Sequence, residues 1–224
     1  MSSYSSAKKV CEMEVQLVTN IINDYFPPFK DLPFDEKVAL FRNFLCHFSI
    51  SDRAYQSYLI FGMNKSDDRL LMSDGGYIKT TELAMFYKDS ATRNAEPEEA
   101  ARIFLPAMTY IVNVILGHMK RISITDVEFM VVVAMFLWDD ALSTISEQTQ
   151  SIICDTRDKI FAELNSYYKS LGMTDQQAAV RMGNLLILLP KMQQSVKMYR
   201  ENCELAELFN ILEVDQCGRS FKPE

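Results

Sequence analysis

The segment 26–42 constrains the fold most, because one helix must end and another must begin within it. Pro27–Pro28 cannot continue a helix, since proline has no backbone N–H and its ring clashes with the preceding turn. Pro33 suits the first turn of a new helix, where a missing N–H leaves no bond unmade. Asp35–Glu36 then complement the positive end of the helix dipole. The segment therefore predicts two helices joined by a short turn.

Apolar residues recur at helical spacing along most of the chain, and only 7 Gly and 7 Pro are available for turns. Both observations favour a single, mostly helical domain. Within segment 49–56 the residues are polar for a central helix, so this part either borders a cavity or is solvated. Helices are expected at residues 5–26, 32–59, 81–88, from 97 onward, 129–137, 146–171 and 174–212.

One short segment breaks the helical period. Asp74-Gly75-Gly76 is a turn signal between the apolar segments 70–72 and 77–78. This order predicts a small β-hairpin.

The segment 129–137 is apolar on every side, which is typical of a helix enclosed by others. Thr125 and Glu128 precede it at the spacing of a capping box. Further along, Gly172 is a predicted C-cap, and Thr174 is a predicted start for the last helix. The apolar helix is expected at the centre of the core.

Composition excludes several classes of function. The net charge of −7 argues against direct nucleic-acid contact by this chain, because phosphate binding needs clustered Lys and Arg. The longest apolar run, 129–138, is too short to cross a bilayer, and the first residues lack the apolar core of a signal peptide. The five cysteines form no C-x-x-C pair, which favours reduced thiols in a nuclear or cytoplasmic protein.

Residues suited to catalysis are few. His47 and His118 are the only histidines, and Cys46 precedes His47 directly, so their side chains diverge on a helix. Asp139–Asp140 suits a polar helix end better than an acid pair. No metal-binding spacing is present. We therefore expect no enzyme activity, no metal site and no cofactor.

Two motifs resemble those of nuclear receptor ligand-binding domains. The first resembles the signature between the third and fourth helices of that family, with Lys37 in place of the usual glutamine. The second, 181–193, resembles the tenth helix of the retinoid X receptor and of hepatocyte nuclear factor four. Lys37 and segment 138–140 are similar to the expanded nematode branch. The first motif comprises Phe29, Leu32, Asp35, Glu36, Lys37, Leu40, Phe41 and Arg42.

The resemblance implies an all-α fold: a three-layer antiparallel helical sandwich with one small β-hairpin and the helix 129–137 in its middle layer. A single ligand-binding-type domain would span residues 1–224. The family's zinc-containing DNA-binding module and the first two helices of its ligand domain are expected to be absent. Its activation helix would fall on 217–222, where Ser220 replaces a glutamate. A register shifted by one turn would instead make Glu213 that glutamate.

The resemblance also implies a ligand pocket. Its alternative is that the same residues simply fill the core. Where related receptors bind a ligand carboxylate through an arginine, this chain has Gln56, and Arg53 one turn earlier could substitute. The implied lining is Cys11, Val15, Leu45, Cys46, Ser49, Gln56, Phe104, Met108, Ile111, Tyr199 and Cys203.

Two interaction surfaces follow from the same resemblance. A coregulator groove would include Asp24, Phe41 and Arg42, and Asp24 replaces the lysine that holds an LxxLL helix, so binding should be weak. A homo- or heterodimer with a related receptor would use Leu185, Leu186, Leu189 and Met192.

The implied function is transcriptional regulation through dimerisation, with a possible hydrophobic ligand and no membrane contact. The alternatives are a helical adaptor or dominant-negative dimerisation partner without a ligand, and a carrier of a hydrophobic molecule.

Overall fold

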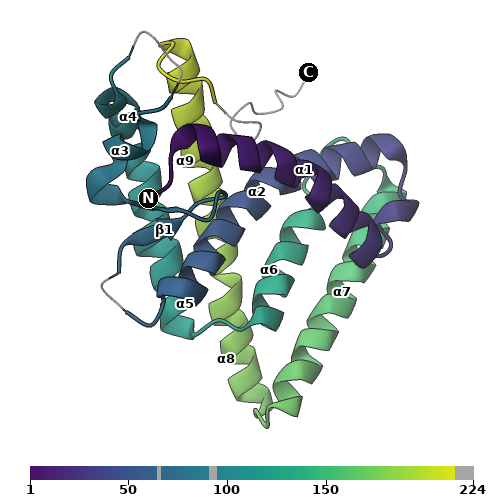
Figure 1. Ribbon diagram of the computed structural model, residues 1–224. Coiled ribbons are helices and arrows are strands. Elements are labelled where there is room, and N and C mark those ends of the chain that lie inside the picture. Colours follow the sequence, from purple (N-terminus) through teal and green to yellow (C-terminus); the bar gives the residue numbers. More distant parts are fainter. Residues whose placement is uncertain (65–66, 91–94, 215–224) are drawn as a thin grey trace.

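The computed structural model describes residues 1–64, 67–90 and 95–214 (Figure 1). Helices account for nearly all of the regular structure. Its α-helices are α1 (Tyr4–Tyr25), α2 (Phe34–Phe61), α3 (Leu83–Tyr87), α4 (Pro97–Tyr110), α5 (Gly117–Ile122), α6 (Asp126–Leu137), α7 (Glu147–Ser170), α8 (Asp175–Leu186) and α9 (Leu188–Leu208). Two 3-10 turns (Phe29–Asp31 and Thr80–Glu82), a π-helix (Ile111–Leu116) and strands β1 (Arg69–Leu71) and β2 (Tyr77–Lys79) complete the elements.

The helices form the expected layered sandwich. The long helix α2 contacts α6, α9 and β1, while α4 packs against α9 and α6 packs against α7. In Figure 1, α1 crosses in front of α2 and α9, and Glu14 of α1 forms an ion pair with Arg53 of α2. The all-α fold class and its small sheet are therefore confirmed.

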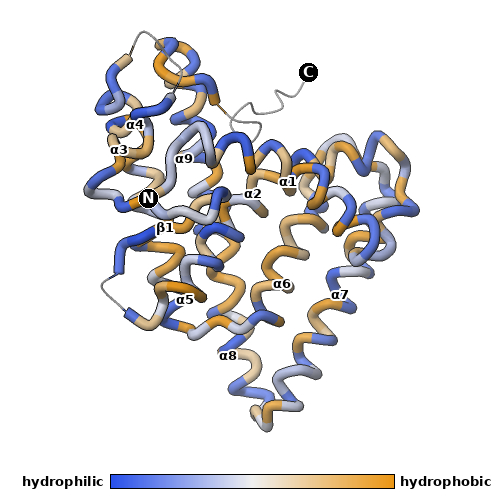
Figure 2. The backbone as a smooth tube through the Cα atoms, viewed as in Figure 1, coloured by the Kyte–Doolittle hydropathy of each residue, from blue (hydrophilic) through white to orange (hydrophobic). Residues whose placement is uncertain are grey.

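Helix α6 lies in the core, as its sequence predicted. Figure 2 shows it hydrophobic along its length, and Val132, Phe136 and Leu137 are buried. One flank is open, however: the side chains of Val127 and Met130 are 41% and 49% exposed. They line a groove of about 980 Å³ between α6, α7 and the end of α1.

The predicted hairpin is present. Leu70 of β1 pairs with Ile78 of β2, and Gly75 takes the left-handed conformation (φ 76°) that the turn requires. The chain start is held against it, because the Ser2 N–H donates to the Tyr77 carbonyl oxygen at 2.9 Å. A Cβ atom on Gly76 would lie 2.8 Å from the Ser2 Cα atom, so this contact also needs a glycine.

Helix ends follow the local sequence signals. The helix before Pro27 ends at Tyr25, and Pro33 is the N-cap residue directly before α2. Thr125 accepts the Glu128 N–H, and the Glu128 side chain accepts the Thr125 N–H, which completes the predicted capping box. Gly172 has a φ of 76°, as expected of a residue that ends a helix.

One expected helix is divided and shorter than predicted, and another changes its helix type part-way. The segment 174–212 is interrupted at Ile187 and ends at Leu208. The interruption has a local cause, since Pro190 has no N–H to donate to the carbonyl oxygen of Leu186. The helix from Pro97 changes to a π-helix over Ile111–Leu116 before α5 continues it. The spacing of hydrophobic residues alone predicted neither the interruption nor the π-helix.

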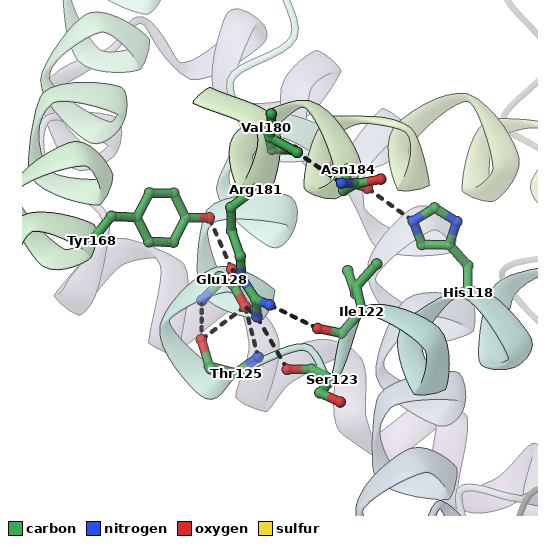
Figure 3. A network of polar contacts seen from close by, with 9 residues as sticks. All are labelled: His118, Ile122, Ser123, Thr125, Glu128, Tyr168, Val180, Arg181 and Asn184. Carbon is green, nitrogen blue, oxygen red and sulfur yellow. Dashed lines mark hydrogen bonds and ion pairs between the residues drawn. The ribbon is translucent and has the colours of Figure 1, made fainter. Parts of the chain in front are cut away.

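A buried ion pair links three of the helices (Figure 3). Arg181 of α8 donates from Nε to Glu128 Oε1 at 2.6 Å and from Nη2 to Oε2 at 2.7 Å. Tyr168 of α7 donates its hydroxyl to the same Oε1 at 2.8 Å. The remaining guanidinium nitrogen, Nη1, donates to the carbonyl oxygen of Ile122 at 2.9 Å. The side chain of Glu128 is 1% exposed, so the contacts replace its water.

The pKa of Glu128 reflects this environment. Burial by itself raises the pKa of the carboxyl group, but the hydrogen bonds from Arg181, Thr125 and Tyr168 outweigh burial, and the pKa lies below its usual value of 4.5. A carboxyl group whose folded-state pKa is depressed stabilises the fold above its unfolded pKa. That stability is lost as the pH falls through the folded-state pKa.

We predict that Glu128→Gln lowers the free energy of unfolding by about 3 kcal/mol at pH 7, because it leaves a partly buried guanidinium without its counter-ion. The difference from the wild type should shrink as the pH falls from 4.5, the usual pKa of this carboxyl group, through the lower folded-state pKa of Glu128. Urea denaturation of both proteins, at pH 7 and over a series of lower pH values, measures the free energy of unfolding. Glu163→Gln on the exposed side of α7 is the control and should change stability by less than about 0.5 kcal/mol. A pH-independent difference would contradict the assignment.

Candidate ligand cavity and interaction surfaces

A small cavity of about 90 Å³ lies between α1, α2, the hairpin, α3, α4 and α9. Most of its wall is aromatic or aliphatic. Six of the residues expected from the sequence line it: Cys11, Ser49, Phe104, Met108, Ile111 and Tyr199. The polar segment of α2 thus borders a cavity through Ser49 and Arg53, one of the two alternatives that its sequence allowed.

The other five expected lining residues do not reach the cavity. Leu45, Cys46 and Cys203 are buried in the core, and Val15 is half-buried against it. The amide of Gln56 donates instead to Asp52 Oδ1 at 3.2 Å.

Aromatic rings account for the smaller space. The ring centroid of Phe104 lies 5.8 Å from that of Tyr199 and 5.7 Å from that of Tyr87. The three rings fill volume that would otherwise extend the cavity along α4. Phe104 and Tyr199, two of the expected lining residues, therefore border the cavity and also fill part of the space beside it.

Sequence reasoning missed the wall formed by the hairpin and by the first turns of α1. Leu70, Met72 and Ser73 line the cavity from the hairpin, and Tyr4 and Ala7 line it from α1. The Ser73 hydroxyl donates to the Ala7 carbonyl oxygen at 2.6 Å, which holds these two walls together. The apolar segment 70–72 was the available signal, but only the tertiary contact with α1 makes it part of the cavity wall.

Each cation at the cavity already has an acidic partner. Arg53 Nη2 lies 3.0 Å from Glu14 Oε1 and 2.7 Å from Asp52 Oδ2. Lys8 Nζ lies 3.3 Å from Glu213 Oε2. Neither cation is therefore available as the unpaired anchor that a ligand carboxylate would need.

The histidines make structural contacts. His47 stacks on Phe136 with ring centroids 4.8 Å apart, and its Nδ1 lies 2.8 Å from the Asn43 carbonyl oxygen. His118 Nε2 lies 2.8 Å from the Asn184 carbonyl oxygen. Burial lowers the pKa of both rings. In residues 1–64, 67–90 and 95–214, no three His, Cys, Asp or Glu side chains are placed to hold a metal ion.

Comparison with known proteins gives the family. The family model for the ligand-binding domain of nuclear hormone receptors matches residues 2–209. The chain belongs to the nuclear hormone receptor family.

Relatives from Caenorhabditis elegans agree with the predicted nematode branch. The high zinc activated nuclear receptor protein is 45% identical over 223 residues, which cover 100% of this chain and 54% of the relative. Nuclear hormone receptor family member nhr-28 is 29% identical over 215 residues, covering 96% of this chain and 48% of the relative. This chain spans about half the length of these curated receptors.

The structure describes the three residues expected in the coregulator groove of this nuclear receptor domain, but not the expected activation helix. Asp24 and Arg42 are exposed, and Phe41 is half-buried. Residues 217–222, including Ser220, lie outside the described residues. The alternative glutamate, Glu213, pairs with Lys8 near the start of α1. Lys8 and Asp24 are about 24 Å apart along the helix, so Glu213 lies far from that end of α1.

The expected dimer surface needs correction. Leu185 and Met192 have no exposed surface, so in this fold they are core residues and cannot contact a partner chain. Leu186 and Leu189 are half-buried. The exposed apolar residues of this region are Val180, at 61%, and Ile187, at 46%. The correction arises because the apolar stripe chosen from the sequence is the one that faces the core.

Proposed function

We propose that this chain is a nuclear-receptor-like transcriptional regulator, located in the nucleus, that acts through protein contacts and a small, partly open cavity. The observation that carries the proposal is the partly open, mostly apolar cavity bounded by α1, α2, α4 and α9, within a domain of the nuclear receptor family. With a net charge of −7, the domain is suited to protein rather than phosphate contacts.

The cavity size bears on the alternatives. Sites for drug-sized ligands occupy about 300–1,000 Å³, and this cavity has about 90 Å³. A carrier would need a larger space in the same position. An adaptor would need exposed apolar surface instead, and Val180 and Ile187 supply such surface on α8 and beside it. We place protein contacts first in the proposed function for this reason.

We predict a dimer that uses the face of α8 bearing Val180 and Ile187. A two-fold interface buries the same surface on both chains, so each substitution acts twice. Val180→Arg and Ile187→Arg should give folded monomers, because both side chains are exposed in the single chain. Sedimentation velocity measures the mass, and Leu59→Arg, at a residue 50% exposed at the end of α2, is the control. A wild-type chain that remains monomeric at high concentration would refute the dimer.

We also predict weak binding of LxxLL peptides. The resemblance assigns Asp24 to the position where the family's lysine contacts the peptide's C-terminal carbonyl groups, and a carboxylate repels that negative helix end. Asp24→Lys should tighten binding about tenfold, as expected for a charge-assisted hydrogen bond of about 1.5 kcal/mol.

Fluorescence anisotropy with a labelled peptide measures this change. Asp158→Lys, on the exposed face of α7, makes the same charge change elsewhere and should have little effect. If the wild type binds tightly and Asp24→Lys brings no gain, the predicted role of Asp24 is wrong.

A further inference from the structure

Two cations and a histidine meet where α5 approaches the first turn of α9, outside the cavity. His118 Nδ1 lies 2.8 Å from Lys191 Nζ and 3.0 Å from Arg121 Nη2. The two positively charged groups are therefore within about 6 Å of each other, a separation at which like charges repel. Such a pair of cations normally needs an anion nearby.

The hydrogen bonds of His118 identify its tautomer. Its Nε2 lies 2.8 Å from the Asn184 carbonyl oxygen (Figure 3), and a carbonyl group can only accept, so Nε2 carries the ring proton. Burial and the charges of Lys191 and Arg121 lower the pKa of the ring, which favours this neutral form. Nδ1 then offers one lone pair to two charged donors, so the site has more donors than acceptors.

No carboxylate balances the two cations. Within residues 1–64, 67–90 and 95–214, every ion pair uses another lysine or arginine, so neither Arg121 nor Lys191 has an acidic partner there. Burial lowers the pKa of Lys191, and the charge of Arg121 lowers it further, which is the effect of a neighbouring cation rather than of an acid. The two residues form a local positive site on an acidic protein.

Both cations are accessible to an added anion. Arg121 is exposed and Lys191 is half-buried, whereas His118 is buried. After the contact with Nδ1, the ammonium and the guanidinium groups each keep further N–H donors. A phosphate monoester carries nearly two negative charges and three acceptor oxygens at neutral pH, so it balances both cations, whereas a carboxylate balances one.

We propose that Arg121 and Lys191 bind the phosphate group of a phosphate monoester, and that His118 positions the two cations. The proposal goes beyond the proposed function, because neither cation lines the cavity. The net charge of −7 disfavours a nucleic-acid backbone, whose binding needs many cations, but a single phosphate group needs only this pair. The group can belong to a free small molecule or to a phosphorylated side chain of a partner protein.

Three probes test the ligand class on the wild-type chain at constant ionic strength and about pH 7.5, where a phosphate monoester is mainly a dianion. These are methyl phosphate, dimethyl phosphate and acetate, of which the last two carry one charge. Calorimetry should show methyl phosphate binding about tenfold more tightly than either monoanion, because only the dianion pairs with both cations. No variant is needed for this comparison.

The histidine ring signals locate the bound anion. The chain has only two histidines, so His47→Gln assigns the imidazole ¹³C signals of both. Methyl phosphate should shift the signal of His118 to saturation and leave that of His47, which stacks on Phe136, unchanged.

Variants test the two cations. Arg121→Gln and Lys191→Gln should each weaken the binding of methyl phosphate about tenfold, as expected for one charge-assisted contact. Arg102→Gln, at an exposed arginine of α4, and Lys197→Gln, at an exposed lysine of α9, remove the same charges elsewhere and should leave the affinity unchanged. Val180→Arg, the monomer variant, should also bind normally, because one chain supplies both cations.

The outcomes decide between the explanations. Equal affinities for methyl phosphate and acetate overturn the phosphate class, and a His118 signal that does not shift overturns the location. An equal loss in Lys197→Gln and Lys191→Gln shows general attraction to surface cations and overturns the site. Loss of binding in Val180→Arg overturns the assignment to a single chain.

A short phosphoserine peptide distinguishes the two sources of the phosphate group. Binding at least about tenfold tighter than methyl phosphate supports a phosphorylated protein, because the peptide then makes contacts beyond the phosphate. Affinity equal to that of methyl phosphate supports a free small molecule. Neither result depends on the cavity or on the dimer.

Discussion

The ion pair between Glu128 and Arg181 is the contact on which the arrangement of α6, α7 and α8 depends. A carboxylate with 1% exposure is tolerable only when its oxygens are hydrogen-bonded. Arg181 supplies two parallel donors, and Tyr168 and the Thr125 N–H supply the others. Because these donors come from different helices, the charge can be buried only when the helices are assembled. The ion pair therefore favours one arrangement of α6, α7 and α8, whereas their apolar surfaces alone could pack in several ways.

Helix α2 connects this framework to the cavity. One side of α2 packs on α6, and another packs on α9 and on β1. Ser49 and Arg53 lie one turn apart on its cavity side, so their spacing is determined by helix geometry. The ring contacts among Phe104, Tyr87 and Tyr199 then limit the space in front of them. The packing of aromatic side chains thus determines the size of the cavity, whereas Ser49 and Arg53 of α2 supply its polar groups.

Burial explains why the interaction surfaces were harder to predict than the fold. Leu185 and Ile187 are both apolar and nearly adjacent, yet Leu185 has no exposed surface and Ile187 is 46% exposed. Periodicity identifies apolar stripes on a helix but does not say which stripe meets the core when two are present. Glu213 shows the same dependence, because its partner Lys8 lies near the other end of the sequence. Only the assembled chain brings them together.

The sequence by itself determined the local structure: the helix ends at Pro27 and Pro33, the capping box at Thr125, the turn at Gly75 and the apolar character of α6. Each of these depends on residues within a few positions, through backbone geometry or a short-range hydrogen bond. It also carried the family motifs and six of the cavity residues. The tertiary structure alone decided the cavity volume, the hairpin wall, the pairing of Arg53 with Glu14, and which apolar residues remain exposed, because these quantities arise from contacts between segments distant in sequence.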